Sequence, residues 1–174
     1  MEYLKSYIRE VPDFPKKGIL FYDITTLMEN PTGFKTALDE MEKYVRSVKA
    51  DKIVAIESRG FIFGAALADR LALPFVSARK PGKLPARTIS QEYALEYGTD
   101  RLEMHADSVN AGERVVVVDD LIATGGTLKA VCAMVERLGG EVAGISSVIA
   151  LTFLPFEATL SGYDLNYLIS YDSE

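Results

Sequence analysis

The stretch RVVVVDDLIATGGTLKA, residues 114–130, decides the fold class of this chain. Its four consecutive valines are typical of a strand that is buried on both faces, as in a parallel sheet. Two carboxylates, Asp119 and Asp120, follow the valines, and a short turn leads into an amphipathic helix over residues 128–138. Because ligands of parallel sheets bind outside the C-terminal ends of the strands, the stretch predicts a ligand site between this strand and this helix.

The turn ATGGT, residues 123–127, has the composition of an anion site. It would present backbone N–H groups at a helix N-terminus, together with the hydroxyls of Thr124 and Thr127. Gly125 and Gly126 let the backbone approach a phosphate because they carry no Cβ atom. The carboxylates before the turn indicate a second group on the same ligand, either hydroxyls that donate hydrogen bonds or a bound Mg²⁺. A sugar phosphate fits this pattern, and the simpler alternative is an aspartate pair that only caps the turn.

The segments on either side alternate between strand and helix patterns. Asn30 and Pro31 are a typical cap and first residue of a helix, and one apolar stripe follows at spacings of four and three: Phe34, Leu38, Met41, Val45 and Val48. Further helices are expected over residues 2–10, 60–72 and 128–138, and residues 12–18 form a loop. Strands are expected over residues 19–25, 52–57, 74–79, 114–118, 141–151 and 163–170. This order predicts an α/β fold, a parallel sheet with helices over its faces.

Residues 80–100 interrupt this regular order with prolines, glycines and basic residues. The segment predicts either a hairpin or a long mobile loop. Long irregular segments inside compact domains are usually functional, so we expect this one to serve the site.

Composition excludes several classes of function. The 174 residues suit a single domain, and a net charge of −6 disfavours a general nucleic-acid binder. One cysteine, Cys132, and one histidine, His105, exclude a cysteine zinc cluster and a two-histidine metal site. His105 is expected to be a half-exposed strand residue rather than part of a catalytic triad. No apolar run suits a signal peptide or a membrane span, so the sequence points to a cytoplasmic protein.

The motif VVVVDDLIATGGT, residues 115–127, resembles the phosphoribosyl pyrophosphate motif of type I phosphoribosyltransferases. Four further segments resemble the adenine phosphoribosyltransferases of that family and occur in the same order: residues 12–25, 57–64, 78–85 and 93–98. The resemblance covers nearly the whole chain. It implies the type I fold and the conversion of adenine and phosphoribosyl pyrophosphate into AMP and pyrophosphate. It also implies Mg²⁺ as cofactor and a homodimer.

The resemblance implies roles for the central motif and the pyrophosphate loops. The 5-phosphate would be bound by Ala123, Thr124, Gly125, Gly126 and Thr127. The ribose hydroxyls would be held by Asp119 and Asp120, and Mg²⁺ would be held through the substrate, with one of these carboxylates as its only candidate protein ligand. Pyrophosphate would contact Ser58, Arg59, Arg79, Lys80 and Lys83, with a strained or cis peptide at the Ser58–Arg59 step. The simpler alternative for these basic residues is a solvated loop.

For the base and the chemistry, the resemblance implies a hood over residues 1–30. The backbone at Leu20 would recognise the exocyclic amine, Phe21 would stack on the purine, and Arg59 would contact purine or pyrophosphate. Glu96 would manage the proton on the purine, beside Tyr97, and the segment 80–100 would close over the site. The simpler alternatives are a core Phe21 and an exposed loop Glu96.

The chain departs from the family pattern at the rim of the base pocket. Tyr22 stands where arginine is frequent, Ala150 stands where an acidic residue is common, and residues 150–160 contain no basic residue. Two alternative functions therefore stay open. One is a transferase for xanthine or guanine, and the other is a non-catalytic sensor of phosphoribosyl pyrophosphate.

Overall fold

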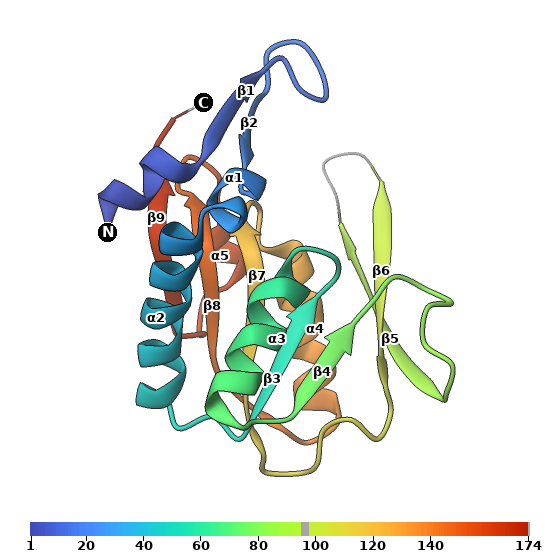
Figure 1. Ribbon diagram of the computed structural model, residues 1–174. Helices are drawn as coiled ribbons and strands as arrows, with labels where there is room; N and C mark the ends of the chain where they lie inside the picture. The colour runs from blue at the N-terminus through green and yellow to red at the C-terminus, as the bar shows by residue number, and fades with distance from the viewer. Residues whose placement is uncertain (95–97, 174) are drawn as a thin grey trace.

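A five-stranded parallel sheet forms the centre of the computed structural model, which describes residues 1–94 and 98–173 (Figure 1). All its neighbouring strands run parallel. In spatial order they are β4 (Phe75–Ala78), β3 (Lys52–Ile56), β7 (Arg114–Ile122), β8 (Glu141–Leu151) and β9 (Leu165–Tyr171). The α/β fold with a parallel sheet is therefore confirmed, and all five C-terminal strand ends meet at one edge.

Helices cover both faces of the sheet (Figure 1). One face carries α2 (Pro31–Ser47) and α3 (Gly60–Leu71), and the other carries α4 (Gly126–Arg137) and α5 (Phe156–Thr159). The valines of β7 serve the two faces in turn: Val116 and Val118 pack in the core beneath α2 and α3, whereas Val115 and Val117 pack in the core beneath α4. This double burial is the reason for the uninterrupted valine run.

The central strand β7 is longer than the sequence predicts. It continues past Val118 to Ile122, because residues beyond the valines still pair with β8: Asp119 lies opposite Ser147 and Ile122 lies opposite Ala150. The two carboxylates are thus part of the strand rather than of the turn after it. This rigid placement fixes their position relative to the neighbouring strand ends.

The N-terminal segment differs from the single helix expected over residues 2–10. A short 3-10 helix, Glu2–Tyr7, is followed by β1 (Arg9–Pro12), which pairs antiparallel with β2 (Leu20–Asp23). Helix α1 (Thr25–Glu29) comes next. Tyr22, at the family departure, stacks on Tyr171 of β9 with ring centroids 3.7 Å apart. In Figure 1 this hairpin projects above the C-terminal edge of the sheet.

The segment 80–100 contributes to a second antiparallel hairpin, formed by β5 (Thr88–Ala94) and β6 (Thr99–His105). Of the two forms expected, the described residues take the hairpin, which extends five residues further along the chain to His105. A backbone bridge between Arg79 and Glu103 ties it to the end of β4, and it packs against α4. His105 is a half-buried strand residue, as expected. Glu96 and Tyr97 lie outside the described residues.

The helix predicted to begin at Pro31 starts there because Asn30 caps it. The Asn30 side chain accepts hydrogen bonds from the backbone N–H groups of Thr32 and Gly33. Leu38, Met41 and Val45 of the predicted stripe are buried. Within the described ranges, no helix is both long and apolar enough to cross a membrane.

Candidate active site

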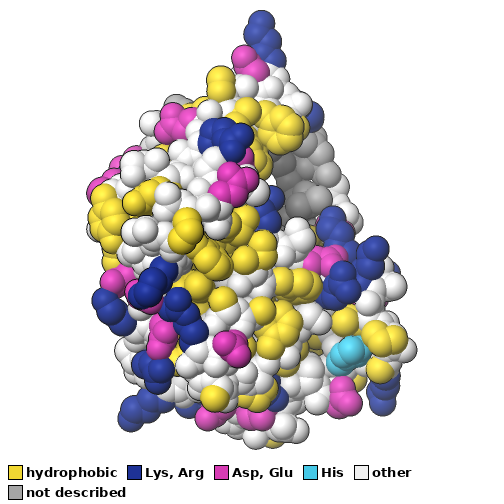
Figure 2. Space-filling view, in the orientation of Figure 1, with side chains coloured by type: hydrophobic (Ala, Val, Ile, Leu, Met, Phe, Trp, Pro, Cys, Tyr) yellow, Lys and Arg dark blue, Asp and Glu magenta, His cyan; other side chains and the backbone are white. Residues whose placement is uncertain are grey.

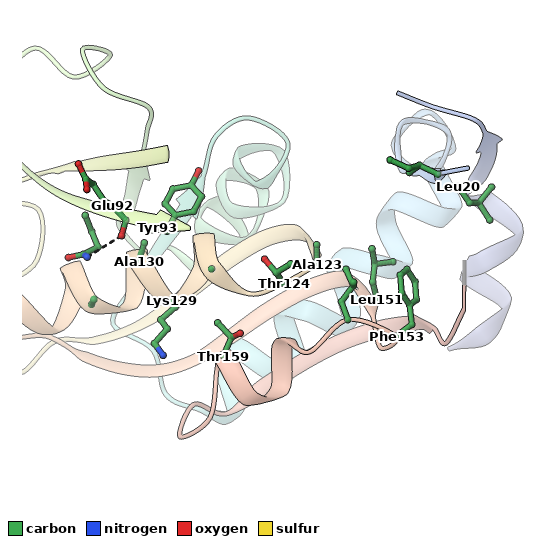
Figure 3. A pocket seen from close by; sticks show the side chains of 15 residues that line it. Leu20, Glu92, Tyr93, Ala123, Thr124, Lys129, Ala130, Leu151, Phe153 and Thr159 are labelled. Carbon is green, nitrogen blue, oxygen red and sulfur yellow. Dashed lines mark hydrogen bonds between the residues drawn. The ribbon is translucent and has the colours of Figure 1, made fainter. Parts of the chain in front are cut away.

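A cavity of about 930 Å³ lies where the C-terminal strand ends meet the two hairpins. Ile19 and Leu20 reach it from the N-terminal hairpin, and residues 91–93 reach it from β5. The turn after β7 and the segment after β8 supply its floor (Figure 3). Segments far apart in the sequence therefore enclose one site.

The cavity has two chemically different ends (Figure 3). The end below the N-terminal hairpin is lined by apolar side chains: Ile19, Leu20, Leu151, Phe153 and Leu154. The other end brings together polar groups around the start of α4: Tyr93, Thr124, Gly126, Lys129 and Thr159. A ligand with a flat apolar part and an anionic part would fit such a cavity lengthwise.

The turn over residues 123–127 forms the N-terminus of α4. Gly125 is the cap residue, with φ of 80°, and α4 begins at Gly126. A side chain at Gly125 would also meet Leu160, whose Cγ lies 3.0 Å from the ideal Cβ position. Glycine is needed here for both conformation and space, and the free N–H groups of the first helical turn remain available to an anion. Tyr93 of β5 lines the same cavity as Thr124 and Gly126, so the hairpin lies beside this turn.

The two aspartates stand side by side but in different surroundings. Asp120 is buried, at 6% exposure, and its Oδ2 accepts a hydrogen bond from Arg59 Nε at 2.6 Å. Asp119 Oδ1 accepts from the backbone N–H of Asp120 at 2.9 Å. Burial, and then the like charge of Asp120, raise the pKa of Asp119 well above its usual range. A group that donates hydrogen bonds or carries positive charge would relieve this strained pair.

The loop after β3 brings Arg59 to the carboxylates. It contains a cis peptide bond between Glu57 and Ser58, so the expected special peptide lies one residue earlier than the Ser58–Arg59 step. Neither bond precedes a proline, and the sequence therefore offers no local signal to tell them apart. Ser58 and Arg59 are exposed, and neither is among the residues that line the cavity.

Glu57 organises the basic segment after β4. Its carboxylate accepts hydrogen bonds from Arg79 Nε and from the backbone N–H of Lys80, both at 2.7 Å. Burial raises the pKa of Glu57, but these two donors outweigh it and hold that pKa below its usual range. Lys80 pairs with Asp100 at 2.9 Å, and Lys83 is exposed nearby. Figure 2 shows Lys and Arg side chains gathered beside the β5–β6 hairpin.

Leu20 and Phe21 of the N-terminal hairpin have different surroundings. Leu20 lines the cavity. Phe21 is not part of the cavity lining, and its ring packs edge to face on Phe14 with centroids 5.1 Å apart. Side chains alternate between the two faces of a strand, which separates these neighbours, and the roles of both residues toward the base stay predictions.

Sequence reasoning missed several residues that line the cavity: Gln91, Glu92, Tyr93, Lys129, Leu151, Phe153 and Leu154. The position of Leu151 and Phe153 at the end of a parallel strand was an available signal. Lys129 lies one turn into α4, and helical periodicity could have indicated that it lines the cavity. The β5 residues reach the cavity only because the β5–β6 hairpin packs against α4, and no short stretch of sequence indicates that packing.

The carboxylate pair is the part of the site that could contact a cation, because it offers oxygen atoms of the kind that Mg²⁺ prefers. Over residues 1–94 and 98–173, no group of three or more His, Cys, Asp or Glu side chains could hold a metal ion.

Comparisons with known proteins agree with this geometry. The model of the phosphoribosyl transferase domain family matches residues 23–154. An adenine phosphoribosyltransferase from Solibacter usitatus is 54% identical over 169 residues, which are 97% of this chain and 98% of that protein. The one from Brachyspira hyodysenteriae is 55% identical, covering 97% and 99% of the two chains.

Solved structures give the same result. The chain superposes on the adenine phosphoribosyltransferase of Thermoanaerobacter pseudethanolicus with a TM-score of 0.94 at 53% identity, over 98% and 99% of the two chains. The Saccharomyces cerevisiae enzyme, solved with an imino-altritol bisphosphate and adenine, gives 0.90 at 38% identity, over 97% of each. The family model over residues 23–154 and the similarity along nearly the whole chain place this protein in the adenine phosphoribosyltransferase family.

Proposed function

We propose that the chain transfers the phosphoribosyl group from phosphoribosyl pyrophosphate to adenine, giving AMP and pyrophosphate in purine salvage. The observation that carries this proposal is the two-ended cavity, with a helix N-terminus at one end and apolar side chains at the other, and with the carboxylate pair on the strand that leads into that helix. The two ends fit a ribose phosphate and a purine in one molecule.

The ribose phosphate is assigned to the β7–α4 segment. The 5-phosphate accepts hydrogen bonds from the turn over residues 123–127, and the ribose diol donates to Asp119 and Asp120. Since Asp120 already accepts from Arg59, the diol and the guanidinium compete for its oxygens. Substrate binding therefore frees Arg59 to contact the base or the leaving anion.

Pyrophosphate release is assigned to the cationic side of the site. Arg59, Arg79, Lys80 and Lys83 supply charge that stabilises the leaving anion, and Ser58 contributes a hydroxyl. Breaking the bond at the anomeric carbon leaves an oxocarbenium-like sugar, so the protein's task is to stabilise charge and to position the base. Asp119 or Asp120 would help to hold a Mg²⁺ ion that is bound through the substrate, and such an ion would supply further positive charge to the leaving anion.

Adenine is assigned to the apolar end of the cavity, beneath the hood formed by residues 1–30. Adenine must lose a ring proton when the new bond forms, and Glu96, beside Tyr97, is the proposed acceptor on the strength of the family resemblance. We further propose that residues 80–100 cover the site and exclude water during the transfer. If these residues cover the site, amide hydrogen exchange in β5 should slow when phosphoribosyl pyrophosphate binds. Unchanged exchange would refute the proposal.

The biological setting is likewise proposed from the family and the sequence. We infer that the protein acts in the cytoplasm as a homodimer, with small-molecule substrates rather than nucleic acid or membranes as its partners. Exposed Ile62 on α3 and Phe75 on the edge strand β4 suit a surface that a second copy covers. Light scattering on the purified protein tests the dimer.

The transfer itself is tested by incubating the purified protein with adenine, phosphoribosyl pyrophosphate and Mg²⁺ and measuring AMP. Asp120→Asn should weaken binding of phosphoribosyl pyrophosphate about tenfold to hundredfold, the usual effect of losing a hydrogen bond to a charged group. Asp164→Asn is the matched control, because that carboxylate pairs with Tyr44 before β9, at the opposite edge of the sheet. Absence of AMP from the wild-type reaction would refute the proposed function. Retained affinity in folded Asp120→Asn would refute the assignment of the diol.

A further inference from the structure

We infer that Phe153 is a specificity-determining residue of the base pocket, whose ring forms the wall on which the purine lies. This inference rests on the proposed function, because it needs a purine at the apolar end of the cavity.

The backbone around Phe153 is held firmly in place. Thr152 donates from its backbone N–H and from its hydroxyl to the carbonyl of Tyr171, both at 2.9 Å. Leu154 donates its N–H to the carbonyl of Leu151 at 3.0 Å, which closes a turn around Phe153. The residue therefore sits on a short turn tied to the end of β9, and its half-buried side chain lines the cavity.

The ring of Phe153 differs from the other phenylalanine rings in its aromatic contacts. Among the described residues, Phe14 and Phe21 form one ring pair, and Phe34, Phe61, Phe63, Phe75 and Phe156 all pack against another aromatic ring, whereas Phe153 belongs to no such pair. In Figure 3 its side chain lies beside Leu151, on the side of the cavity across from Leu20. An aromatic face that no protein ring covers is thus presented to the apolar end of the cavity.

The apolar end of the cavity is suited to bind a flat, uncharged heteroaromatic ring. The side chains at this end are apolar and uncharged. They therefore favour a ligand that binds through a large area of apolar contact rather than through hydrogen bonds. A two-ring purine gains more from the Phe153 face than a single-ring pyrimidine does. The contact therefore raises affinity for purines as a class, while selection of the exocyclic amine is left to backbone groups such as those of Leu20.

The test separates the base end from the phosphate end by direct titration. AMP contacts both ends of the cavity, whereas ribose 5-phosphate contacts only the end at α4. We expect Phe153→Leu to weaken AMP binding about tenfold, within the range seen when a base loses an aromatic partner. Its affinity for ribose 5-phosphate should not change. Phe153→Tyr keeps the aromatic face and should bind AMP like the wild type.

Phe34→Leu is the matched control, since it removes a half-buried aromatic ring from α2 that does not line the cavity. Unchanged AMP binding by Phe153→Leu would overturn the inference, and so would an equal loss of affinity for both ligands. A wild-type protein that binds ribose 5-phosphate and AMP equally tightly would overturn it as well. Failure of the proposed function looks different, because the wild type would then bind neither ligand.

Discussion

At the scale of single residues, binding function and stability oppose each other at Asp119. Its pKa is raised by burial and by the neighbouring carboxylate of Asp120. The folded chain therefore holds a proton on Asp119 more tightly than the unfolded chain does. Through this group alone, the free energy of unfolding increases as the pH falls from the raised pKa toward about 4, where an unperturbed aspartate titrates.

Asp119→Asn should consequently stabilise the unliganded protein at neutral pH while it weakens substrate binding. Asparagine keeps an oxygen that can accept from the backbone N–H of Asp120 but removes the charge repulsion. We expect a higher melting temperature and a loss of affinity for phosphoribosyl pyrophosphate of about tenfold or more. Thermal unfolding and titration of the same samples measure both effects. A lower melting temperature would show that the carboxylate supports the unliganded fold.

Glu113 shows the opposite dependence on pH. It accepts hydrogen bonds from the backbone N–H of Asn110 and from buried Lys52, whose Nζ lies 2.6 Å away. These contacts lower the pKa of Glu113 from 4.5 to about 2. Its contribution to stability is therefore complete above about pH 5 and is lost as the pH falls toward 2.

Replacing Glu113 with Gln should reduce the free energy of unfolding at pH 7 by up to about 3 kcal/mol, at about 1.4 kcal/mol per pKa unit. The difference from wild type should shrink as the pH is lowered, which urea denaturation between pH 7 and pH 3 can follow. Glu141→Gln serves as control, because the Arg114–Glu141 pair is exposed and should contribute little. A constant difference at every pH would contradict the low pKa.

At the scale of elements, two glycines of α3 fix the distance between this helix and the sheet. An ideal Cβ at Gly64 would lie 2.4 Å from the Cβ of Ala55 in β3. At Gly60 it would lie 2.9 Å from Asp119 Oδ1 and 3.1 Å from the carbonyl oxygen of Val118. The missing side chain of Gly64 allows α3 to pack closely on β3, and the missing side chain of Gly60 leaves room for the carboxylate of Asp119.

The two alanine substitutions should therefore behave differently. Gly64→Ala should destabilise the fold by about 1–3 kcal/mol, the usual cost of overpacking, and leave substrate affinity of the folded protein unchanged. Gly60→Ala should displace Asp119 and weaken binding of phosphoribosyl pyrophosphate more than it lowers stability. Urea midpoints of both variants measure the change in stability, and their dissociation constants for phosphoribosyl pyrophosphate measure the change in binding. Wild-type affinity in Gly60→Ala would mean that the close approach has no part in binding.

Local patterns predicted the elements whose residues are buried on a regular face. Strand β8 has the predicted bounds, and Asn30 caps α2 as its sequence indicates. The predictions failed where distant partners decide the conformation. Strand β7 extends to Ile122 because β8 lies beside it, and Arg9–Pro12 is a strand because β2 pairs with it.

At the scale of the whole molecule, the site is a product of topology. The parallel sheet brings Arg59, Arg79, Asp120 and Phe153 to one edge, although their positions span 95 residues of sequence. The motif over residues 115–127 is the basis for assigning the phosphate, and that assignment stays a prediction. The lining of the apolar end was anticipated only in part, because which of Leu20 and Phe21 faces the cavity depends on how the hairpin lies on the sheet, and no local sequence pattern fixes that direction.

The central claim is that this cavity joins adenine, in preference to other purines, to a ribose phosphate. It is tested most directly by one competition reaction, in which limiting phosphoribosyl pyrophosphate and Mg²⁺ meet equal amounts of adenine, guanine, hypoxanthine and xanthine. We predict AMP as the dominant nucleotide, formed in a one-to-one ratio with pyrophosphate. A dominant guanine or xanthine nucleotide would contradict the assignment of the base, and binding of phosphoribosyl pyrophosphate without formation of any nucleotide would identify a sensor instead of an enzyme.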